Sequence, residues 1–282
     1  MSLSEKIKEN ILRTSSYIDK VQLIDEKPLF SHLDINITEL CNRKCVFCPR
    51  VDESEYPNQN LNMNLDLAQK ISDELLELKY QGVIVLSGFG EPTLHPDFLN
   101  VIRILSKCSR LELITNGDKL NKEYIKKLKE AGLNYIVVSM YDGPHQIEPF
   151  KEMFRELNLG EDFFLLRDRW HNSDDDYGLK LTNRAGKVTI GNQDEVDVTH
   201  PCYYTAYSLT IDWNGDVLLC IQDWNKKVKL GNILFQNLYE VWNSSILKKR
   251  RKKLISGNRC DAPCKNCNVD GTLHGFNHIK FF

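Results

Sequence analysis

Three cysteines near the start of the chain, Cys41, Cys45 and Cys48, stand in the spacing CxxxCxxC. Three thiolates on one short loop hold three irons of a cubane iron-sulfur cluster, because soft sulfur ligands suit such centres. The fourth iron then has no protein ligand and is free to bind a small molecule. A structural zinc ion is the alternative, but zinc sites of that kind are closed by four ligands, and no Cys or His follows Cys48 until His95.

A second group of cysteines lies in the last third of the chain, where Cys264 and Cys267 form a CxxC pair. With the more distant Cys202 and Cys220, they supply four thiolates, which is a closed ligand set for a second iron-sulfur cluster. A zinc ribbon uses the same number of ligands. The spacing alone therefore leaves both kinds of site open.

The composition is that of an ordinary globular protein, with 282 residues of which 41% are hydrophobic and 27% charged. The formal net charge of -2 gives no general attraction to nucleic acid, and no apolar run reaches the length of a membrane span. The N-terminus is polar and lacks the apolar core of a signal peptide, so we expect a cytoplasmic protein. Nine cysteines in such a chain predict metal ligands rather than disulfides, because cytosolic thiols are kept reduced.

Strand-like and helix-like segments alternate through the first part of the chain. Apolar runs predict strands at residues 32–37, 83–86, 111–114, 135–139 and 163–166. Apolar residues at helical spacing predict helices over residues 67–78, 98–105, 124–128 and 150–157. Such alternation predicts parallel strands joined by right-handed helical crossovers, with the chemistry at the carboxyl ends of the strands. Periodicity does not separate an open sheet from a barrel.

The character of the sequence changes beyond about residue 190. The turn signal Asn214-Gly215 is flanked by apolar runs and predicts a β-hairpin whose second strand carries Cys220.

The first cysteine loop, with Phe47 just before its third cysteine, resembles the signature of the radical S-adenosylmethionine enzymes. The segment 88–92, GFGEP, is similar to the family's GGEP segment with Phe89 in the place of the second glycine. The resemblance implies an α/β fold of the class of a partial (β/α)6 TIM-type barrel. It also implies S-adenosyl-L-methionine and a 4Fe-4S cluster as cofactors, the cluster being bound by Cys41, Cys45 and Cys48. The cofactor-binding residues that it implies are Phe47, Gly88, Gly90, Glu91, Thr115, Asn116 and Ser139.

The C-terminal region resembles the SPASM and twitch extensions of the same enzymes, which bind auxiliary iron-sulfur clusters. A full SPASM domain has seven cysteines, and only five are present here, so the resemblance favours the twitch form with one auxiliary 4Fe-4S cluster. Because Pro263 precedes the CxxC pair, we interpret Cys260 as the spare cysteine. The implied ligands are Cys202, Cys220, Cys264 and Cys267. The implied domains are an N-terminal extension (1–30), the barrel (31–190) and the auxiliary-cluster domain (191–282).

The family chemistry implies a 5′-deoxyadenosyl radical that abstracts a hydrogen atom from the substrate, while the auxiliary cluster accepts an electron. Length and cysteine layout are similar to those of the deoxy-scyllo-inosamine dehydrogenase-like enzymes, which implies oxidation of an alcohol in a sugar-like or cyclitol-like small molecule. One alternative is a peptide-modifying SPASM enzyme that forms thioethers or epimers, and another is a non-enzymatic iron-sulfur or zinc module. The expected partners are a small-molecule substrate and an electron donor such as flavodoxin or ferredoxin, without nucleic acid or membrane.

Oxidation of an alcohol also requires a base within hydrogen-bond reach of the hydroxyl group. Position at the ends of the predicted strands makes Tyr141, Asp168, Arg169 and His171 the candidates. The stretch Asn183-Arg184-Ala185-Gly186 is similar to one that precedes SPASM regions, but the sequence assigns Arg184 no role.

Overall fold

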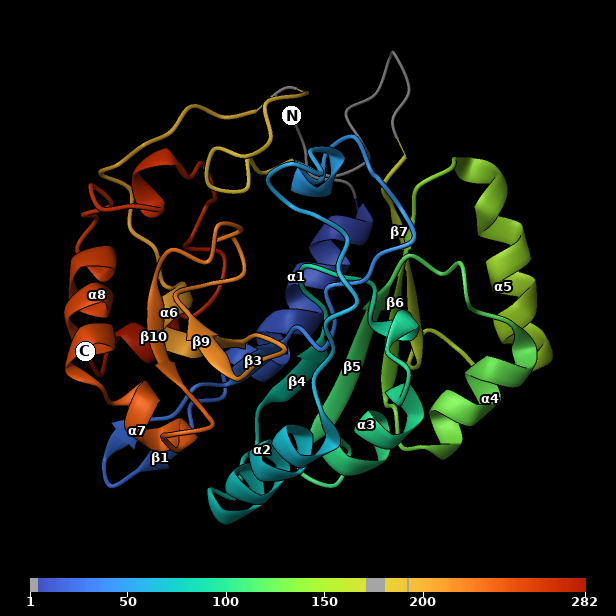
Figure 1. Ribbon diagram of the computed structural model, residues 1–282, viewed down its shortest axis with the longest axis horizontal. Helices are drawn as coiled ribbons and strands as arrows, with labels where there is room; N and C mark the ends of the chain where they lie inside the picture. The colour runs from blue at the N-terminus through green and yellow to red at the C-terminus, as the bar shows by residue number, and fades with distance from the viewer. Residues whose placement is uncertain (1–4, 171–180, 192) are drawn as a thin grey trace.

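One eight-stranded β-sheet forms the centre of the molecule (Figure 1). The computed structural model describes residues 5–170, 181–191 and 193–282. Across the sheet, the strands are β10 (Lys229–Asn232), β9 (Asp216–Leu218), β8 (Ser208–Ile211), β3 (His32–Ile35), β4 (Val83–Leu86), β5 (Arg110–Thr115), β6 (Tyr135–Met140) and β7 (Phe164–Asp168). The six strands from β8 to β7 are parallel, whereas β9 is antiparallel to both β8 and β10. The outermost strands, β7 and β10, each pair on one side only, so the sheet is open.

Helices follow the parallel strands and cover one face of the sheet (Figure 1). They are α2 (Leu65–Glu77), α3 (Phe98–Leu105), α4 (Lys122–Glu130) and α5 (Ile147–Glu156). The chain begins with α1 (Glu5–Ile18) and a hairpin of β1 (Leu23–Ile24) and β2 (Lys27–Pro28). The C-terminal region adds α6 (Tyr204–Tyr207), α7 (Leu238–Trp242), α8 (Ser245–Ile255) and α9 (Phe276–Ile279). Single turns of 3-10 helix occur at Pro49–Val51, Pro92–Leu94, Pro144–Gln146 and Cys264–Asn266. Of the described helices, none has the length and apolar composition needed to cross a bilayer.

Polar side chains explain where several helices begin. Asn64 accepts a hydrogen bond from the third residue of α2, and Asn121 does the same for α4. Asn237 and Glu240 form a reciprocal capping box at the start of α7. These bonds satisfy backbone N–H groups that have no partner within the helix.

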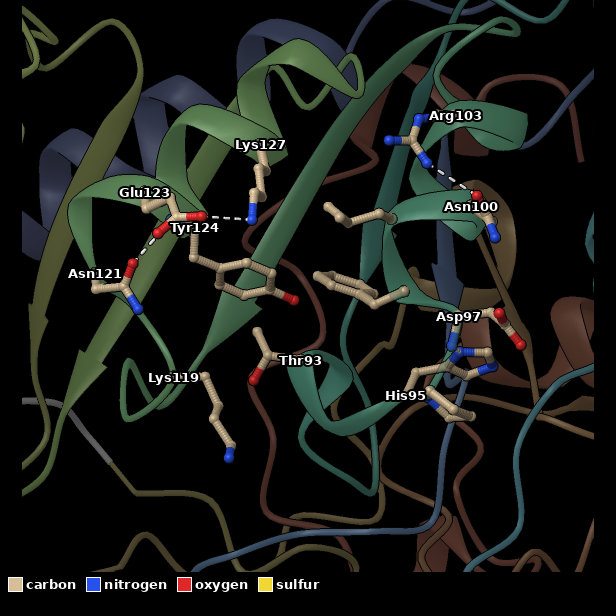
Figure 2. Close-up of a pocket in the computed structure, with 13 residues that line it drawn as sticks. Thr93, His95, Asp97, Asn100, Arg103, Lys119, Asn121, Glu123, Tyr124 and Lys127 are labelled. Carbon is tan, nitrogen blue, oxygen red and sulfur yellow. Dashed lines mark hydrogen bonds and ion pairs between the residues drawn. The ribbon is translucent and has the colours of Figure 1, made fainter.

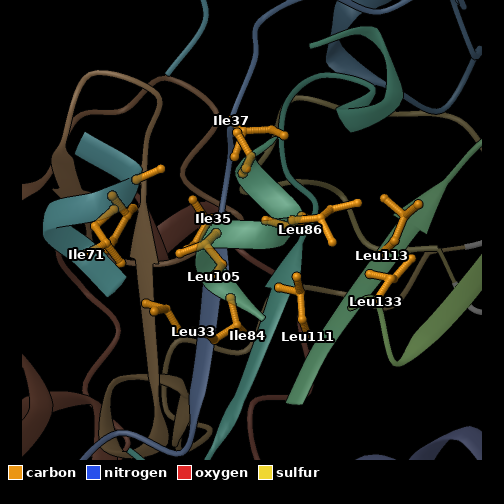
Figure 3. Packing of buried hydrophobic residues seen from close by; sticks show 14 of the residues in the cluster. Leu33, Ile35, Ile37, Ile71, Ile84, Leu86, Leu105, Leu111, Leu113 and Leu133 are labelled. Carbon is orange, nitrogen blue, oxygen red and sulfur yellow. The ribbon is translucent and has the colours of Figure 1, made fainter. Parts of the chain in front are cut away.

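The hydrophobic core lies between the sheet and helices α2 to α5 (Figure 3). Alternate residues of each strand point to this side, because the side-chain period of a strand is two. They are buried and apolar, and they include Leu33, Ile35, Ile84, Leu86, Leu111, Leu113, Ile136, Val138, Leu209 and Ile211. Ile71 of α2 and Leu105 of α3 pack against them.

The opposite face of the sheet is largely polar. The intervening strand residues include His32, Asp34, Arg110, Glu112, Ser139, Arg167, Ser208 and Thr210. Helix α1 packs on this face, where Arg13 forms an ion pair of 2.6 Å with Glu112 and lies 4.3 Å from the ring centroid of Tyr135. Since Tyr135 is the first residue of β6, α1 covers the amino ends of the strands. A parallel sheet buried on both faces would carry apolar side chains on both, so the polar face indicates a functional surface.

The fold class predicted from the sequence is confirmed, including its five predicted parallel strands and the helices between them. The sixth parallel strand, β8, comes from beyond the predicted domain boundary at residue 190 and pairs directly with β3. The predicted hairpin is formed by β8 and β9, but the ladder ends at Leu218, so Cys220 lies just past the second strand. The division at residue 190 itself stays a prediction.

Adjacent leucines in α2 allow a test of this packing. We expect Leu75→Ala, at a fully buried position, to lower the free energy of unfolding by about 2–5 kcal/mol, because it leaves a cavity in the core. Leu76→Ala is the matched control, since Leu76 is 46% exposed, and should change it by no more than about 0.5 kcal/mol. Urea unfolding followed by circular dichroism measures both. Equal decreases in the free energy of unfolding for Leu75→Ala and Leu76→Ala would contradict this description of the core.

Candidate functional site

The first cysteine loop follows β3 at the carboxyl end of the parallel strands. Its thiols are free of disulfides and partly buried. Burial, and then the neighbouring Cys48 and Cys41, raise the pKa of Cys45 to about 12. The loop turns through a hydrogen bond of 2.8 Å from the Cys48 N–H to the Cys45 carbonyl, and both backbone groups of Cys41 bind the Asn58 side chain. The three thiols are therefore close enough to influence one another's ionisation.

Residues between the cysteines attach this loop to the next two strands. Arg43 donates to Asp118, beyond β5, at 2.7 Å and to Asp142, beyond β6, at 2.7 Å. Asn42 donates to Asp118 at 2.6 Å and accepts from Asn116 at 2.9 Å. These contacts were not predicted from the sequence, although the polar residues within the cysteine motif and the aspartates just after the strands were signals of them.

The glycine-containing turn after β4 packs directly against the backbone beyond β3. A Cβ on Gly90 would stand 2.2 Å from the Thr38 carbonyl oxygen. Gly88 has φ +128, and a Cβ there would lie 2.7 Å from the Asn36 side chain. The Asn36 side-chain oxygen accepts from the N–H groups of Phe89 at 3.0 Å and Gly90 at 3.3 Å. Both glycines are thus required by close approach of the chain.

Glu91 joins the ends of β4 and β5. Its buried carboxylate accepts hydrogen bonds from Thr93 at 2.7 Å, Thr115 at 2.6 Å and the Asn116 N–H at 2.8 Å. Burial raises the pKa of Glu91, and the bonds from Thr115 and Asn116 oppose that rise. Three of the predicted cofactor-binding residues, Glu91, Thr115 and Asn116, are thus brought together.

A buried network of charges connects the first cysteine loop to the hairpin of the C-terminal region. Asn36 donates to Glu39 at 3.0 Å and to Asp212, at the end of β8, at 2.7 Å. Arg50 forms an ion pair with Glu39 at 2.6 Å, and Lys226 forms ion pairs with both Glu39 and Asp212. Burial raises the pKa of Asp212, and Lys226 opposes this. This network was not predicted from the sequence. Polar residues directly after apolar strands indicate a site at the strand ends, but nothing in the sequence marks Lys226 as part of it.

The candidate bases divide according to the face of the sheet on which they lie. Arg169 and Tyr141 influence each other's pKa at the ends of β7 and β6, and beside them Arg167 donates to the Ser139 hydroxyl at 2.6 Å. Burial, then the charge of Arg167, lowers the pKa of Arg169 to about 9, whereas burial raises that of Tyr141. Strand alternation directs Asp168 to the other face. His171 lies outside the described residues.

Phe47, also a predicted cofactor-binding residue, closes one side of this region. Its ring lies 5.5 Å from that of Tyr141, and it is buried with Leu181 and Val188. The first cysteine loop therefore contacts both the end of β6 and the segment that follows residue 180.

The second group of thiols comes from three separate segments of the C-terminal region. Burial raises the pKa of Cys220, and Cys267, Cys264 and Cys202 raise it further. Burial, then Cys202 and Cys267, raise the pKa of Cys264 to about 12. Cys260, in contrast, is exposed. The structure therefore places the four predicted ligands in one group.

The donor chemistry of both groups fits iron-sulfur clusters, which are held by cysteine thiolates. Among the described residues, no three His, Cys, Asp or Glu side chains gather around a point that one metal ion would fill. A cubane takes each thiolate on a different iron, so its ligands stand farther apart than those of a single ion. Three thiols at the first site and four at the second match an open and a closed cluster respectively.

A pocket of about 630 Å³ lies elsewhere, between α3 and α4 (Figure 2). Arg103 and Lys127 are on its rim and bind Asn100 at 2.9 Å and Glu123 at 2.6 Å. Of the described residues that line it, none is a cysteine or a predicted cofactor ligand. The candidate site is therefore the polar strand-end region and not this pocket.

Two family models match the chain. Residues 35–157 match the radical SAM superfamily, and residues 202–268 match SPASM, an iron-sulfur cluster-binding domain. The first match contains the CxxxCxxC loop and the strand-end residues, and the second contains the four grouped thiols.

Two known proteins are similar over most of the chain and a third over part of it. The S-adenosyl-L-methionine-dependent 2-deoxy-scyllo-inosamine dehydrogenase of Niallia circulans is 26% identical over 245 residues, which cover 85% of this chain and 93% of that protein. A tungsten-containing aldehyde ferredoxin oxidoreductase cofactor-modifying protein of Pyrococcus furiosus is 33% identical over 110 residues, or 39% of this chain and 30% of that protein. The crystal structure of BtrN in complex with AdoMet and 2-DOIA matches with a TM-score of 0.73 and 26% identity, covering 89% of this chain and 98% of that one. The chain therefore contains a radical SAM domain followed by a SPASM iron-sulfur cluster-binding domain.

Proposed function

We propose that this protein is a radical S-adenosylmethionine dehydrogenase that oxidises an alcohol carbon of a sugar-like or cyclitol-like small molecule. The observation that carries the proposal is the presence of two separate sets of cysteine thiols. One set has three members, on the loop after β3, and the other has four, in the C-terminal region. The similarity over most of its length to a dehydrogenase that is named for an aminocyclitol supports the substrate class.

The chain's own contribution is to hold and separate the reactants. Cys41, Cys45 and Cys48 would hold the first cluster, and Cys202, Cys220, Cys264 and Cys267 would hold the auxiliary cluster. Bound there, the first cluster with S-adenosylmethionine would supply radical abstraction of a hydrogen atom, and the auxiliary cluster would supply an acceptor for the remaining electron.

The residues at the ends of β4, β5 and β6 position S-adenosylmethionine. Glu91 acts by holding Thr115 and Asn116 in place, because its carboxylate accepts hydrogen bonds from both. The Ser139 hydroxyl and the Arg167 guanidinium stand together on the polar face, where they present donors that suit a carboxylate such as that of methionine. The remaining residues proposed to line the cofactor are Phe47, Gly88 and Gly90.

We propose that Arg169 binds the oxygen of the substrate hydroxyl group. It lies with Tyr141 on the polar face at the ends of β7 and β6, and a guanidinium keeps its charge in proteins, so it stabilises negative charge that develops on this oxygen as the proton leaves. Tyr141 keeps its proton, because burial raises its pKa, and so it serves as a hydrogen-bond donor.

The cysteine thiols also support a proposal for the cellular compartment. Free cysteines that bind iron suit a reducing compartment, so we place the protein in the cytoplasm. The electron that starts each turnover comes from a small carrier such as flavodoxin or ferredoxin.

The function is tested by following the abstracted hydrogen. Anaerobically reconstituted protein is incubated with S-adenosylmethionine, a reductant and 2-deoxy-scyllo-inosamine or related cyclitols and sugars that carry deuterium at the carbinol carbon. We expect deuterium in the 5′-deoxyadenosine and a ketone product, both measured by mass spectrometry. Absence of deuterium transfer from every alcohol in the panel, while S-adenosylmethionine is still cleaved, would refute the alcohol-oxidising function.

Cysteine variants separate the two clusters. We expect Cys41→Ala to abolish cleavage of S-adenosylmethionine, because the open cluster is lost. Cys202→Ala should still cleave it, form no ketone, and contain about four irons in place of about eight. Iron analysis and chromatography of 5′-deoxyadenosine measure these effects. Cys260→Ala is the control and should keep both the iron content and the ketone, since this exposed thiol is proposed to be spare. Undiminished ketone formation by Cys202→Ala would remove the auxiliary cluster from the reaction.

The role of Arg169 predicts a split between two reactions. Arg169→Gln should lower the rate of ketone formation by about 10-fold or more, because a charge-assisted hydrogen bond to the substrate oxygen is lost, and should leave cleavage of S-adenosylmethionine without substrate unchanged. Both rates are measured by chromatography of the products. An undiminished rate of ketone formation in Arg169→Gln would remove Arg169 from the substrate site.

A further inference from the structure

Helix α8 carries a run of positive charge that the proposed reaction does not use. Residues 248–253 read KKRRKK, and the segment 245–267 contains eight Lys and Arg residues against one Asp, in a chain whose formal net charge is -2. The surface formed by α8 therefore differs in sign from the charge of the molecule as a whole.

One side of α8 is fixed to the C-terminal region. Leu247, Arg251 and Leu254 are buried. The Arg251 guanidinium donates to the Thr205 carbonyl at 2.6 Å, and its central carbon lies 4.1 Å from the ring centroid of Trp242. These contacts use one arginine of the run for packing and give the helix a set position.

The other side of α8 presents three exposed lysines, Lys248, Lys249 and Lys252, which we call the lysine face. They lie three and four residues apart and so share one side of the helix. Within the described part of the chain, no carboxylate forms an ion pair with any of the three. Like charges at this spacing destabilise a helix. The stability of α8 therefore does not explain the lysine face.

The helix is joined beside its lysine face to the loop that leads into the CxxC pair. Asp261, in that loop, forms ion pairs with Arg250 at 3.1 Å and with Lys253 at 2.9 Å. The Asp261 carbonyl accepts from the Lys265 N–H at 3.0 Å, and Lys265, which stands between the two cysteines of the pair, is exposed. The CxxC turn therefore reaches the surface next to α8.

The last turn of α8 also contacts the segment that carries another proposed ligand of the auxiliary cluster. The Cys202 N–H donates to the Leu254 carbonyl at 2.9 Å. Just beyond the helix, the Arg259 guanidinium donates to the Pro201 carbonyl at 2.7 Å. A partner bound on the lysine face would thus stand close to the auxiliary thiols.

The surface around the first cysteine loop has a different charge pattern. Lys44 forms an ion pair with Glu53 at 2.7 Å. Arg43 forms ion pairs with both Asp118 and Asp142. Cations that are already paired attract an acidic protein less strongly, so the charge pattern favours docking beside the auxiliary thiols.

We propose that the lysine face of α8 docks a small acidic redox protein, of the flavin or iron-sulfur class, that takes the electron from the auxiliary cluster. The inference rests on the two-cluster function proposed above, in which the substrate leaves one electron on that cluster in each turnover. The reduced cluster loses this electron and returns to its oxidised form, and the oxidised carrier gains it. Complementary charge steers such partners together, and electron-transfer interfaces are small enough for one side of a helix.

The test measures electron transfer between purified proteins. Anaerobically reconstituted enzyme is reduced, freed of reductant and mixed in a stopped-flow instrument with an oxidised flavodoxin, whose reduction is followed by its absorbance. We expect Lys249→Glu/Lys252→Glu to lower the bimolecular rate constant by about 10-fold or more at low ionic strength, because steering is lost. The difference should diminish as salt is added, since salt screens exposed charges.

Three controls locate the effect. Lys126→Glu/Lys129→Glu makes the same change at the same spacing on exposed lysines of α4, on the opposite side of the molecule (Figure 1), and should leave the rate constant unchanged. A neutral quinone used in place of flavodoxin should be reduced equally fast by all variants. In a Cys202→Ala background, which keeps the first cluster, the α8 substitutions should have no effect.

The outcomes distinguish this docking role from the function on which it rests. Equal rate constants for the α8 and α4 variants, in protein with about eight irons, would overturn docking on α8 and leave the two-cluster function intact. About four irons in the wild type would overturn both. An equal decrease in the Cys202→Ala background, or with the quinone, would overturn the role in emptying the auxiliary cluster. Binding of an RNA duplex that the α8 substitutions abolish, with unchanged transfer to flavodoxin, would assign the surface to nucleic acid.

Discussion

A carboxylate buried away from water requires hydrogen bonds or a nearby cation, and pairing with cations joins two distant parts of this chain. Asp212 and Glu39 share the ammonium group of Lys226, and Arg50 neutralises Glu39 from the first cysteine loop. Removing one partner of such a buried pair typically costs about 3–5 kcal/mol, because an uncompensated charge remains. The loop that carries Cys48 therefore cannot shift relative to the C-terminal hairpin without a large penalty. Its position is set by charge pairing as much as by packing.

The rest of the site depends on a sheet whose two faces differ. Leucine, isoleucine and valine side chains on one face bury themselves against α2 to α5, which makes the strands rigid. The other face carries charged and hydroxyl side chains, and α1 covers its amino ends through Arg13 and Glu112. Rigid strands with polar residues at their carboxyl ends are a suitable support for a reactive intermediate. Side chains carried by tightly packed strands keep fixed positions, whereas those on mobile loops do not.

The parts predicted from the sequence were those with a local signal. Apolar periodicity located the parallel strands and their helices, and the cysteine spacing identified both thiol groups. The spare position of Cys260 agrees with its exposure but stays a prediction. The pairing of Lys226 with Glu39 was not predictable, since it joins residues far apart in sequence whose types have many ordinary uses. A lysine in a loop looks the same whether it faces water or neutralises two buried carboxylates.

The place of β8 in the sheet has a consequence for how the protein is made. β3 and its cysteine loop leave the ribosome early, but the strand that covers one edge of β3 follows much later, and Asn36 and Asp212 are 176 residues apart. Contacts so distant in sequence form late in folding, and an uncovered strand edge invites pairing with other chains. β3 and its cysteine loop are therefore synthesised early but become rigid only after β8 has been made. If iron were inserted before the C-terminal strands are synthesised, Asp212 and Lys226 would still be missing from the network beside this loop.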